Sequence, residues 1–278
     1  MSVINVGQAI VLGIVEGLTE FLPVSSTGHL KITEGLMDIP VDDKGVVGFT
    51  AVIQVGAIAA VLVYFFSDIV RIVKAWGVGI ARPSERYHHD YKFGWWVIFA
   101  TVPVVIVGVA AKDLIEGPLA SLWVVAGSLI GGSAVMFAAD RLGTHKRGED
   151  DTSLTDAMLI GSSQILALLF PGFSRSGATM STGLMLGLDR VAATRLSFFL
   201  GIPALTGAGI YELPSALGSG AGVLPLAVGT TVSFIVAYAS IAWLLRFVAR
   251  HSFTSFVVYR IVVGLLLFGL LGTGTLNA

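Results

Sequence analysis

Long apolar stretches alternate with short polar ones along the whole chain. Six of the apolar stretches are continuous, at residues 46–66, 93–111, 119–139, 194–213, 223–245 and 256–273. A hydrocarbon core of about 30 Å needs about 20 apolar residues per helix, so each of these stretches is long enough to cross a membrane. The pattern therefore predicts six transmembrane helices.

Two further apolar stretches, residues 7–36 and 156–188, are interrupted in the middle by proline, glycine and serine. Each interruption exposes backbone groups that lipid cannot satisfy, and such backbone is tolerated only inside protein or beside a watery cavity. We therefore expect these two stretches to form re-entrant helix hairpins. The predicted fold class is an all-α polytopic membrane protein with six transmembrane helices and two re-entrant hairpins.

Composition supports a single integral membrane domain over residues 1–278. The chain is 55% hydrophobic and 13% charged, about half the charged fraction of a soluble domain. Its 34 glycines are typical of tightly packed membrane helices, and a surface rich in small residues would also permit a homodimer. The net charge of -1 gives no reason to expect a nucleic-acid partner, and the absence of cysteine excludes disulfides and thiolate chemistry.

The basic residues predict the orientation in the membrane. Three lysines, Lys31, Lys44 and Lys112, lie in the loops of one side. The loops of the other side hold twelve basic residues: Arg71, Lys74, Arg82, Arg86, Lys92, Arg141, Lys146, Arg147, Arg190, Arg195, Arg246 and Arg250. By the positive-inside rule this richer side faces the cytoplasm. Arg260 is expected to snorkel from the cytoplasmic start of the last span.

The order of elements, a hairpin followed by three spans, occurs twice. The two halves cover approximately residues 1–140 and 150–278, and Pro23 and Pro171 of the two hairpins are 148 positions apart. Three spans are an odd number, so the second half is inverted relative to the first. Inverted repeats place a site near the midplane, where broken helices meet. The alternative is a chance similarity between two tips rich in glycine, serine and proline.

The first tip reads EGLTEFLPVSSTGH, from Glu16 to His29. Glu16 and Glu20 are four apart and lie on one helical face. Two such carboxylates suit a divalent cation, Mg²⁺ or Ca²⁺, or acid/base chemistry. They would also suit a solvated crevice that binds nothing.

The hydroxyl cluster that follows in the first tip contains a candidate nucleophile. Ser26 is the candidate, with His29 as the base that takes its proton and a glutamate that orients the base. Ser25 and Thr27 are candidates for phosphate binding. Two alternatives remain open: His29 attacks phosphorus itself, or the cluster is ordinary capping sequence.

The second tip, PGFSRSGAT, is typical of an oxyanion cradle. Arg175 offers a guanidinium fork to phosphate oxygens, and helix N-terminal amides favour anions. Ser174, Ser176 and Thr179 are further phosphate-binding candidates. An internal salt bridge from Arg175 to Glu16 or Glu20 is the alternative.

Two glutamines complete the candidate site. Gln54 in the first span and Gln164 before the second tip are candidate supporting amides, although an interhelical hydrogen bond is the better explanation of each.

EGLTEFLPVSSTGH and PGFSRSGAT closely resemble the two signature motifs of the undecaprenyl-diphosphate phosphatases of the bacitracin-resistance type. The likeness extends over essentially the whole chain. It implies hydrolysis of undecaprenyl diphosphate to undecaprenyl phosphate, which recycles the lipid carrier for cell-wall polymers.

The resemblance also implies roles for individual residues. The family's paired acidic residues fall on Glu16 and Glu20, its serine nucleophile on Ser26 and its histidine on His29. Its phosphate-binding groups fall on Ser174, Arg175 and Thr179. A divalent cation, a bacterial plasma-membrane location and an active site open to the periplasmic or extracellular face are expected from the same source.

One departure concerns Gln164. Between Gln164 and Pro171 the chain has one residue more than the family pattern, so Ser163 or Ile165 is an alternative for the place of Gln164. The residues beyond Pro171 are unaffected.

The sequence features also fit two functions other than a phosphatase of this family. A lipid-phosphate transporter or flippase would use the same inverted-repeat site. A lipid phosphatase of the acid-phosphatase type is disfavoured, because its usual motifs are absent. The nucleophile candidates Ser26 and His29 beside the two glutamates favour chemistry over passage, since passage requires no nucleophile.

Overall fold

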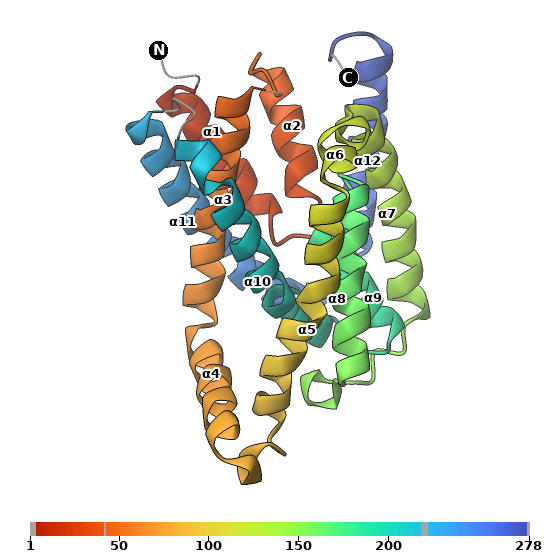
Figure 1. Ribbon diagram of the computed structural model, residues 1–278. Helices are drawn as coiled ribbons and strands as arrows, with labels where there is room; N and C mark the ends of the chain where they lie inside the picture. The colour runs from red at the N-terminus through yellow and green to blue at the C-terminus, as the bar shows by residue number, and fades with distance from the viewer. Residues whose placement is uncertain (1–3, 42, 218–221, 277–278) are drawn as a thin grey trace.

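The computed structural model describes residues 4–41, 43–217 and 222–276, and within them the regular structure is helical (Figure 1). The α-helices are α1 (Val6–Thr19), α2 (Ser26–Leu36), α3 (Lys44–Tyr64), α4 (Phe66–Ala81), α5 (His89–Ala110), α6 (Lys112–Glu116), α7 (Leu122–Leu142), α8 (Leu154–Leu169), α9 (Arg175–Met185), α10 (Arg190–Leu217), α11 (Val223–Val248) and α12 (Thr254–Gly272). Three short 3₁₀ turns, η1 (Pro83–Glu85), η2 (Pro118–Ala120) and η3 (Glu149–Asp151), lie in the connections.

The six predicted spans are confirmed. Six helices are long and apolar enough to cross a membrane: Gly45–Tyr64, His89–Ala110, Leu122–Leu142, Arg190–Tyr211, Val223–Val248 and Thr254–Gly272. Each overlaps one predicted stretch. The chain is therefore an all-α, multi-pass membrane protein.

The segment 67–92, which connects the first two spans, contains helix α4. The acidic Asp68 in its first turn complements the helix dipole. Arg71 pairs with Asp68 at 3.2 Å and with Asp90 of α5 at 2.5 Å, and α4 packs along α5.

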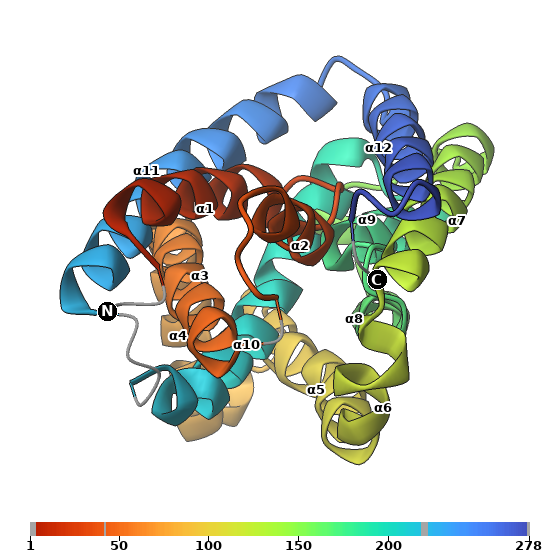
Figure 2. The ribbon, with the colours of Figure 1, turned by 90° about the horizontal axis from the view of Figure 1, so that it is seen from above.

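The helices form a bundle with α10 running through its middle. Seen from above, α1 lies along α11 on one side, and α7 lies along α12 on another (Figure 2). Helix α10 packs against α3, α5 and α9, so it connects these groups. Helices α4 and α5 meet at one end of the molecule, whereas α1 begins and α12 ends at the other (Figure 1).

The helix pair α8–α9 returns to the place where it starts. The amides of Lys146 and Arg147, before α8, each donate to the carbonyl of Gly187, after α9, at 3.0 Å. Arg147 also pairs with Asp156 at 2.6 Å, and this hydrogen bond raises the pKa of Arg147. The re-entrant path and the inverted repeat stay predictions; the closed base of α8–α9 is consistent with a re-entrant hairpin.

Two glycines let the first half approach α11 closely. A Cβ atom at Gly17 of α1 would lie 2.7 Å from the carbonyl oxygen of Ser233, and one at Gly56 of α3 would lie 2.3 Å from that of Thr230. Neither position has space for a side chain. The abundance of glycine therefore has a direct packing role, and it fixes α1, which carries Glu16 and ends directly before Glu20.

A buried carboxylate joins three helices near the α4–α5 end. Asp140 of α7 accepts a hydrogen bond from Arg190 Nε at 2.7 Å and another from the amide of Phe253 at 3.2 Å. It thereby ties the start of α10 and the start of α12 to α7.

Asp140→Asn should lower the free energy of unfolding by about 2 kcal/mol, because hydrogen bonds to charged groups contribute about 1.5–3 kcal/mol each. The measurement is the thermal unfolding midpoint in detergent. Asp150→Asn, at an exposed position, is the matched control and should leave the midpoint nearly unchanged. Equal midpoints for the two variants would contradict this role for Asp140.

Candidate functional site

Both tips turn through a serine in the same unusual conformation. Ser25 has φ 76° and Ser174 has φ 75°, a region that non-glycine residues rarely occupy. Each serine caps the helix that follows, and its Oγ accepts from the amide of Gly28 at 3.3 Å or of Gly177 at 3.1 Å. Strained backbone of this kind concentrates at functional sites.

This matching geometry aligns the two tips. The capping serines are 149 positions apart, one more than the prolines, because the second tip has one extra residue between its proline and its serine. Ser26 and Arg175 are therefore equivalent, each being the first residue of its helix. One half places a hydroxyl there and the other half a guanidinium.

Glu20 receives a side chain from each half. Arg175 Nη2 donates to Glu20 Oε1 at 3.1 Å, and Ser26 Oγ donates to Glu20 Oε2 at 2.5 Å. The carboxylate is 4% exposed and the guanidinium 15% exposed, so water screens this contact little. The two tips therefore meet at Glu20, and the salt bridge that was the alternative for Arg175 is present.

Arg175 keeps unused donors. Its Nε and Nη1 atoms are buried and have no hydrogen-bond partner in the described part of the chain. Buried polar groups nearly always have partners, so such atoms call for a ligand or ordered water. The first residues of α2 and α9, Ser26 and Arg175, both contact Glu20, so the two helices begin close to this carboxylate. The first amides of a helix have no carbonyl partner within it. The arrangement suits an oxyanion.

His29 faces away from Ser26. Its Nδ1 lies 2.7 Å from the carbonyl oxygen of Ser25, and its Nε2 lies 2.7 Å from the hydroxyl of Tyr259. The carbonyl accepts, so Nδ1 carries the proton and Nε2 accepts from the tyrosine. Both ring nitrogens are thus engaged, and among the described residues the hydrogen bond expected from Ser26 to His29 is replaced by the one to Glu20.

Several of the predicted phosphate-binding hydroxyls are engaged in holding the tips. Ser176 Oγ donates to the carbonyl of Leu22 in the first tip at 2.9 Å and contacts Ser174 Oγ at 3.1 Å. Thr179 is fully buried, and its hydroxyl lies 2.6 Å from Ser197 Oγ of α10. Thr27 is exposed. The phosphate-binding roles of Ser25, Thr27, Ser174, Ser176 and Thr179 stay predictions.

The two candidate glutamines differ from what was expected. Gln164 is buried, but its Nε2 donates to Gly161 of its own helix at 3.3 Å and its Oε1 has no partner in the described residues. Its hydrogen bond is therefore within α8 and not between helices. Gln54 lies half-buried on α3, and no hydrogen bond joins it to the other described site residues.

The carboxylates fit a cation that takes most of its ligands from water and substrate. Glu16 is 1% exposed, and its Oε1 atom has no partner among the described residues. The same part of the chain holds no group of three histidine or acidic residues arranged for a metal. Mg²⁺ is commonly bound by one or two carboxylates together with phosphates, so the donor types of Glu16 and Glu20 fit such an ion, and the cation stays a prediction.

Four residues near the tips were missed as site residues in the sequence. Tyr259 contacts His29, and Ser197 contacts Thr179. Gly201 of α10 leaves room for Arg175, because a Cβ atom there would lie 2.0 Å from the guanidinium Nη1. Arg260 was expected to snorkel, and that expectation was wrong: it is fully buried and donates to carbonyl groups of both tips. Only Arg260, a charge inside an apolar stretch, carried a signal in the sequence.

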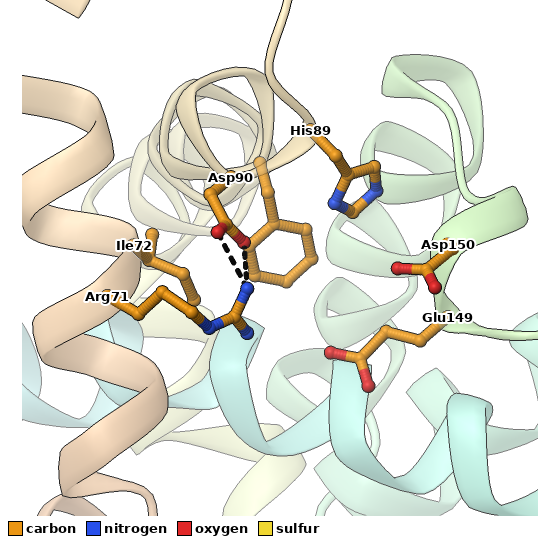
Figure 3. A pocket seen from close by; sticks show the side chains of 7 residues that line it. Arg71, Ile72, His89, Asp90, Glu149 and Asp150 are labelled. Atoms are coloured by element: carbon orange, nitrogen blue, oxygen red, sulfur yellow. Dashed lines mark hydrogen bonds and ion pairs between the residues drawn. The ribbon is translucent and has the colours of Figure 1, made fainter.

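A cavity of about 130 Å³ lies on other elements, where α4, the start of α5 and η3 meet (Figure 3). Its charged lining is largely paired, with Arg71 held by Asp90. Arg195 joins the same end of the molecule by pairing with Asp68 at 3.1 Å and Glu149 at 2.6 Å. These ion pairs hold α4, α10 and η3 together, so the cavity belongs to a structural network and not to the candidate site.

A family model described as bacitracin resistance protein BacA matches residues 9–266. The chain belongs to the BacA family. The matched residues include both tips and Arg260, so every contact described above lies within the part that defines BacA proteins.

Similar proteins cover the whole length of this BacA chain. Undecaprenyl-diphosphatase 1 of Streptomyces avermitilis is 80% identical over 277 residues, covering 100% of both chains. The protein of the same name from Streptomyces coelicolor is 78% identical over 278 residues, and that of Frankia alni is 74% identical over 278 residues, again with full coverage.

Proposed function

We propose that the protein is an undecaprenyl-diphosphate phosphatase, which hydrolyses undecaprenyl diphosphate to undecaprenyl phosphate and inorganic phosphate. The observation that carries the proposal is the contact of Ser26 and Arg175 with the two oxygens of Glu20. These groups suit phosphoryl transfer: the hydroxyl can act as nucleophile, the carboxylate as its base, and the unpaired guanidinium donors can bind phosphate oxygens. The names of the full-length relatives support the same substrate.

In the first step Ser26 Oγ attacks the terminal phosphorus of the diphosphate. Its proton passes to Glu20 Oε2, to which it is already hydrogen-bonded. The bond from phosphorus to the bridging oxygen breaks, and undecaprenyl phosphate leaves. The product of this half-reaction is a phosphoserine at Ser26.

In the second step a water molecule attacks that phosphoserine. Glu20, which has passed its first proton to the departing undecaprenyl phosphate, accepts a proton from this water. It then gives that proton to the Ser26 oxygen as the bond from that oxygen to phosphorus breaks, so the serine hydroxyl reforms and inorganic phosphate is released. A single carboxylate serves both steps, as general acid–base catalysis requires a group within hydrogen-bond reach. His29 keeps Ser25 in place through its Nδ1 and does not itself take the serine proton.

Arg175 stabilises the charge that moves during transfer. The Nε and Nη1 atoms lack partners in the described residues and can bind phosphate oxygens while Nη2 stays on Glu20. The amides at the starts of α2 and α9 add donors to the same space. Phosphoryl transfer leaves the protein mainly positioning and electrostatic work, which this arrangement supplies.

Glu16 and Glu20 would hold a divalent cation, Mg²⁺ or Ca²⁺. Such an ion would neutralise diphosphate oxygens and orient them. The unpartnered Oε1 of Glu16 supports this assignment.

We further propose that the protein lies in the bacterial plasma membrane with its site open to the outer face, where it recycles the lipid carrier for cell-wall synthesis. The uneven distribution of basic residues supports this orientation. The ion pairs of Arg71 and Arg195 gather at the α4–α5 end, as expected for the cytoplasmic side. The prenyl tail would stay in lipid between helices.

A lipid-phosphate transporter is the second candidate. The matching tips of the two halves favour it, because broken helices in repeated halves are a transporter architecture. Phosphate release by protein solubilised in detergent separates the two, since transport needs two compartments.

Ser26→Ala and Glu20→Gln should each lower kcat at least about 100-fold, because a general base contributes about 10²–10⁴-fold. The double variant should be no slower than the slower single one, since the two residues act as a unit. The measurement is phosphate release from a long-chain prenyl diphosphate. Substantial activity in Ser26→Ala would exclude serine attack and return the role of nucleophile to His29 or water.

Gly201→Ala should lower kcat/KM by about 100-fold, because displacing a positioned group by about 1 Å costs this much. The added methyl group would occupy the space of the Arg175 guanidinium. Gly207→Ala on the same helix is the matched control, since nothing lies within 4 Å of a Cβ atom there. Equal kinetics of the two variants would remove Arg175 from its proposed position.

A chelator should abolish phosphate release, and added Mg²⁺ or Ca²⁺ should restore it. Glu16→Gln should raise the cation concentration needed for half-maximal rate, because one carboxylate ligand is lost. Full activity of the wild-type protein in excess chelator would contradict the proposed cation.

A further inference from the structure

Arg260 occupies an unusual place for a charged residue. It lies on α12, is 0% exposed, and forms no ion pair with any residue in the described part of the chain. A guanidinium at membrane depth is costly, and such residues are almost always functional.

The guanidinium is satisfied by backbone carbonyl groups of three separate segments. Its Nη1 donates to Pro23 of the first tip at 2.9 Å. Its Nη2 donates to Phe173 at 2.8 Å and to Gly172 at 3.1 Å, both in the second tip. Longer contacts, 3.4 Å to Leu129 and 3.5 Å to Ser128, reach α7.

The carbonyl groups that accept from Arg260 lie shortly before Ser26 and Arg175, the two residues with proposed roles in the reaction. Pro23 lies three residues before Ser26, and Phe173 lies two before Arg175. Each tip then passes through a serine at positive φ, a conformation that persists only when its surroundings enforce it. A planar fork with five donors suits this task, whereas a lysine would offer one point charge.

The neighbouring helices leave space for this side chain. A Cβ atom at Gly132 of α7 would lie 2.3 Å from Arg260 Nη2, and one at Gly177 of α9 would lie 2.9 Å from its Nη1. Next to Arg260, Tyr259 holds His29. Successive residues of α12 thus contact the histidine and the tips.

We propose that Arg260 is a positioning residue that ties the two tips together, so that Ser26 and Arg175 face one phosphate. It touches neither the substrate nor the reacting atoms. The proposal rests on the phosphatase function and adds to it the element that sets the geometry of the site.

The test uses purified full-length protein and four variants: Arg260→Lys, Arg260→Met, Gly132→Ala and Gly131→Ala. Gly132→Ala crowds the guanidinium, whereas at Gly131 nothing lies within 4 Å of a Cβ atom. These adjacent glycines give the same chemical change with and without contact to Arg260. This matched pair separates the effect of disturbing Arg260 from a general effect of substitution in α7.

We expect both Arg260 variants to lose about 100-fold in kcat and Gly132→Ala about 10-fold, with KM changed much less, because misplaced groups weaken the transition state. Gly131→Ala should stay within about twofold of wild type. Hydrogen exchange of peptides covering residues 20–29 and 170–179 should become faster in the first three variants only. Loss in Arg260→Lys, which keeps the charge, would show that geometry and not charge alone is needed.

A folded Arg260→Lys protein with the kcat and the hydrogen exchange of wild type would overturn the proposal that Arg260 ties the tips together. Identical behaviour of Gly132→Ala and Gly131→Ala would overturn it as well, and this pair decides the matter if the Arg260 variants do not fold. If the wild-type protein releases no phosphate from a prenyl diphosphate, the proposed function fails, while hydrogen exchange still tests whether Arg260 holds the tips.

Discussion

The contact between Glu20, Ser26 and Arg175 is the interaction on which the site depends. It joins Arg175 to Glu20, 155 positions earlier in the sequence, and its carboxylate is nearly inaccessible to water. A buried carboxylate needs both partners, because losing one leaves an unpaired charge. Among the described residues, Glu20 is the base with which the Ser26 hydroxyl forms a hydrogen bond.

Several contacts elsewhere in the molecule hold the elements that carry these three residues. Close approach at Gly17 and Gly56 seats α1 and α3 on α11, and Ser176 and Thr179 connect the second tip to the first and to α10. Arg260 gathers carbonyl groups from both tips. The site is thus held by backbone and hydroxyl groups and not by apolar packing alone, as expected where polar groups must be satisfied internally.

The sequence predicted the elements better than their contacts. The six spans follow from hydropathy alone, because lipid selects for length and apolar character. The pairing of Ser26 with Glu20 could not be predicted from the sequence, because His29 is nearer to Ser26 along the chain. Only the structure shows that the imidazole ring of His29 points toward Tyr259. Arg260 was misread because a charge near the end of a span is usually able to reach the interface, and only the fold shows carbonyl groups around it. The space at Gly201 has no signature in a single sequence.

The equivalence of Ser26 and Arg175 has a consequence for the repeat itself. In both tips a capping serine with positive φ, Ser25 or Ser174, precedes a short helix. The residue that follows it is Ser26, with a hydroxyl group, in the first tip and Arg175, with a guanidinium group, in the second. Glu20 and Ser26 come from the first tip and Arg175 from the second, so neither tip alone can assemble the three-residue contact.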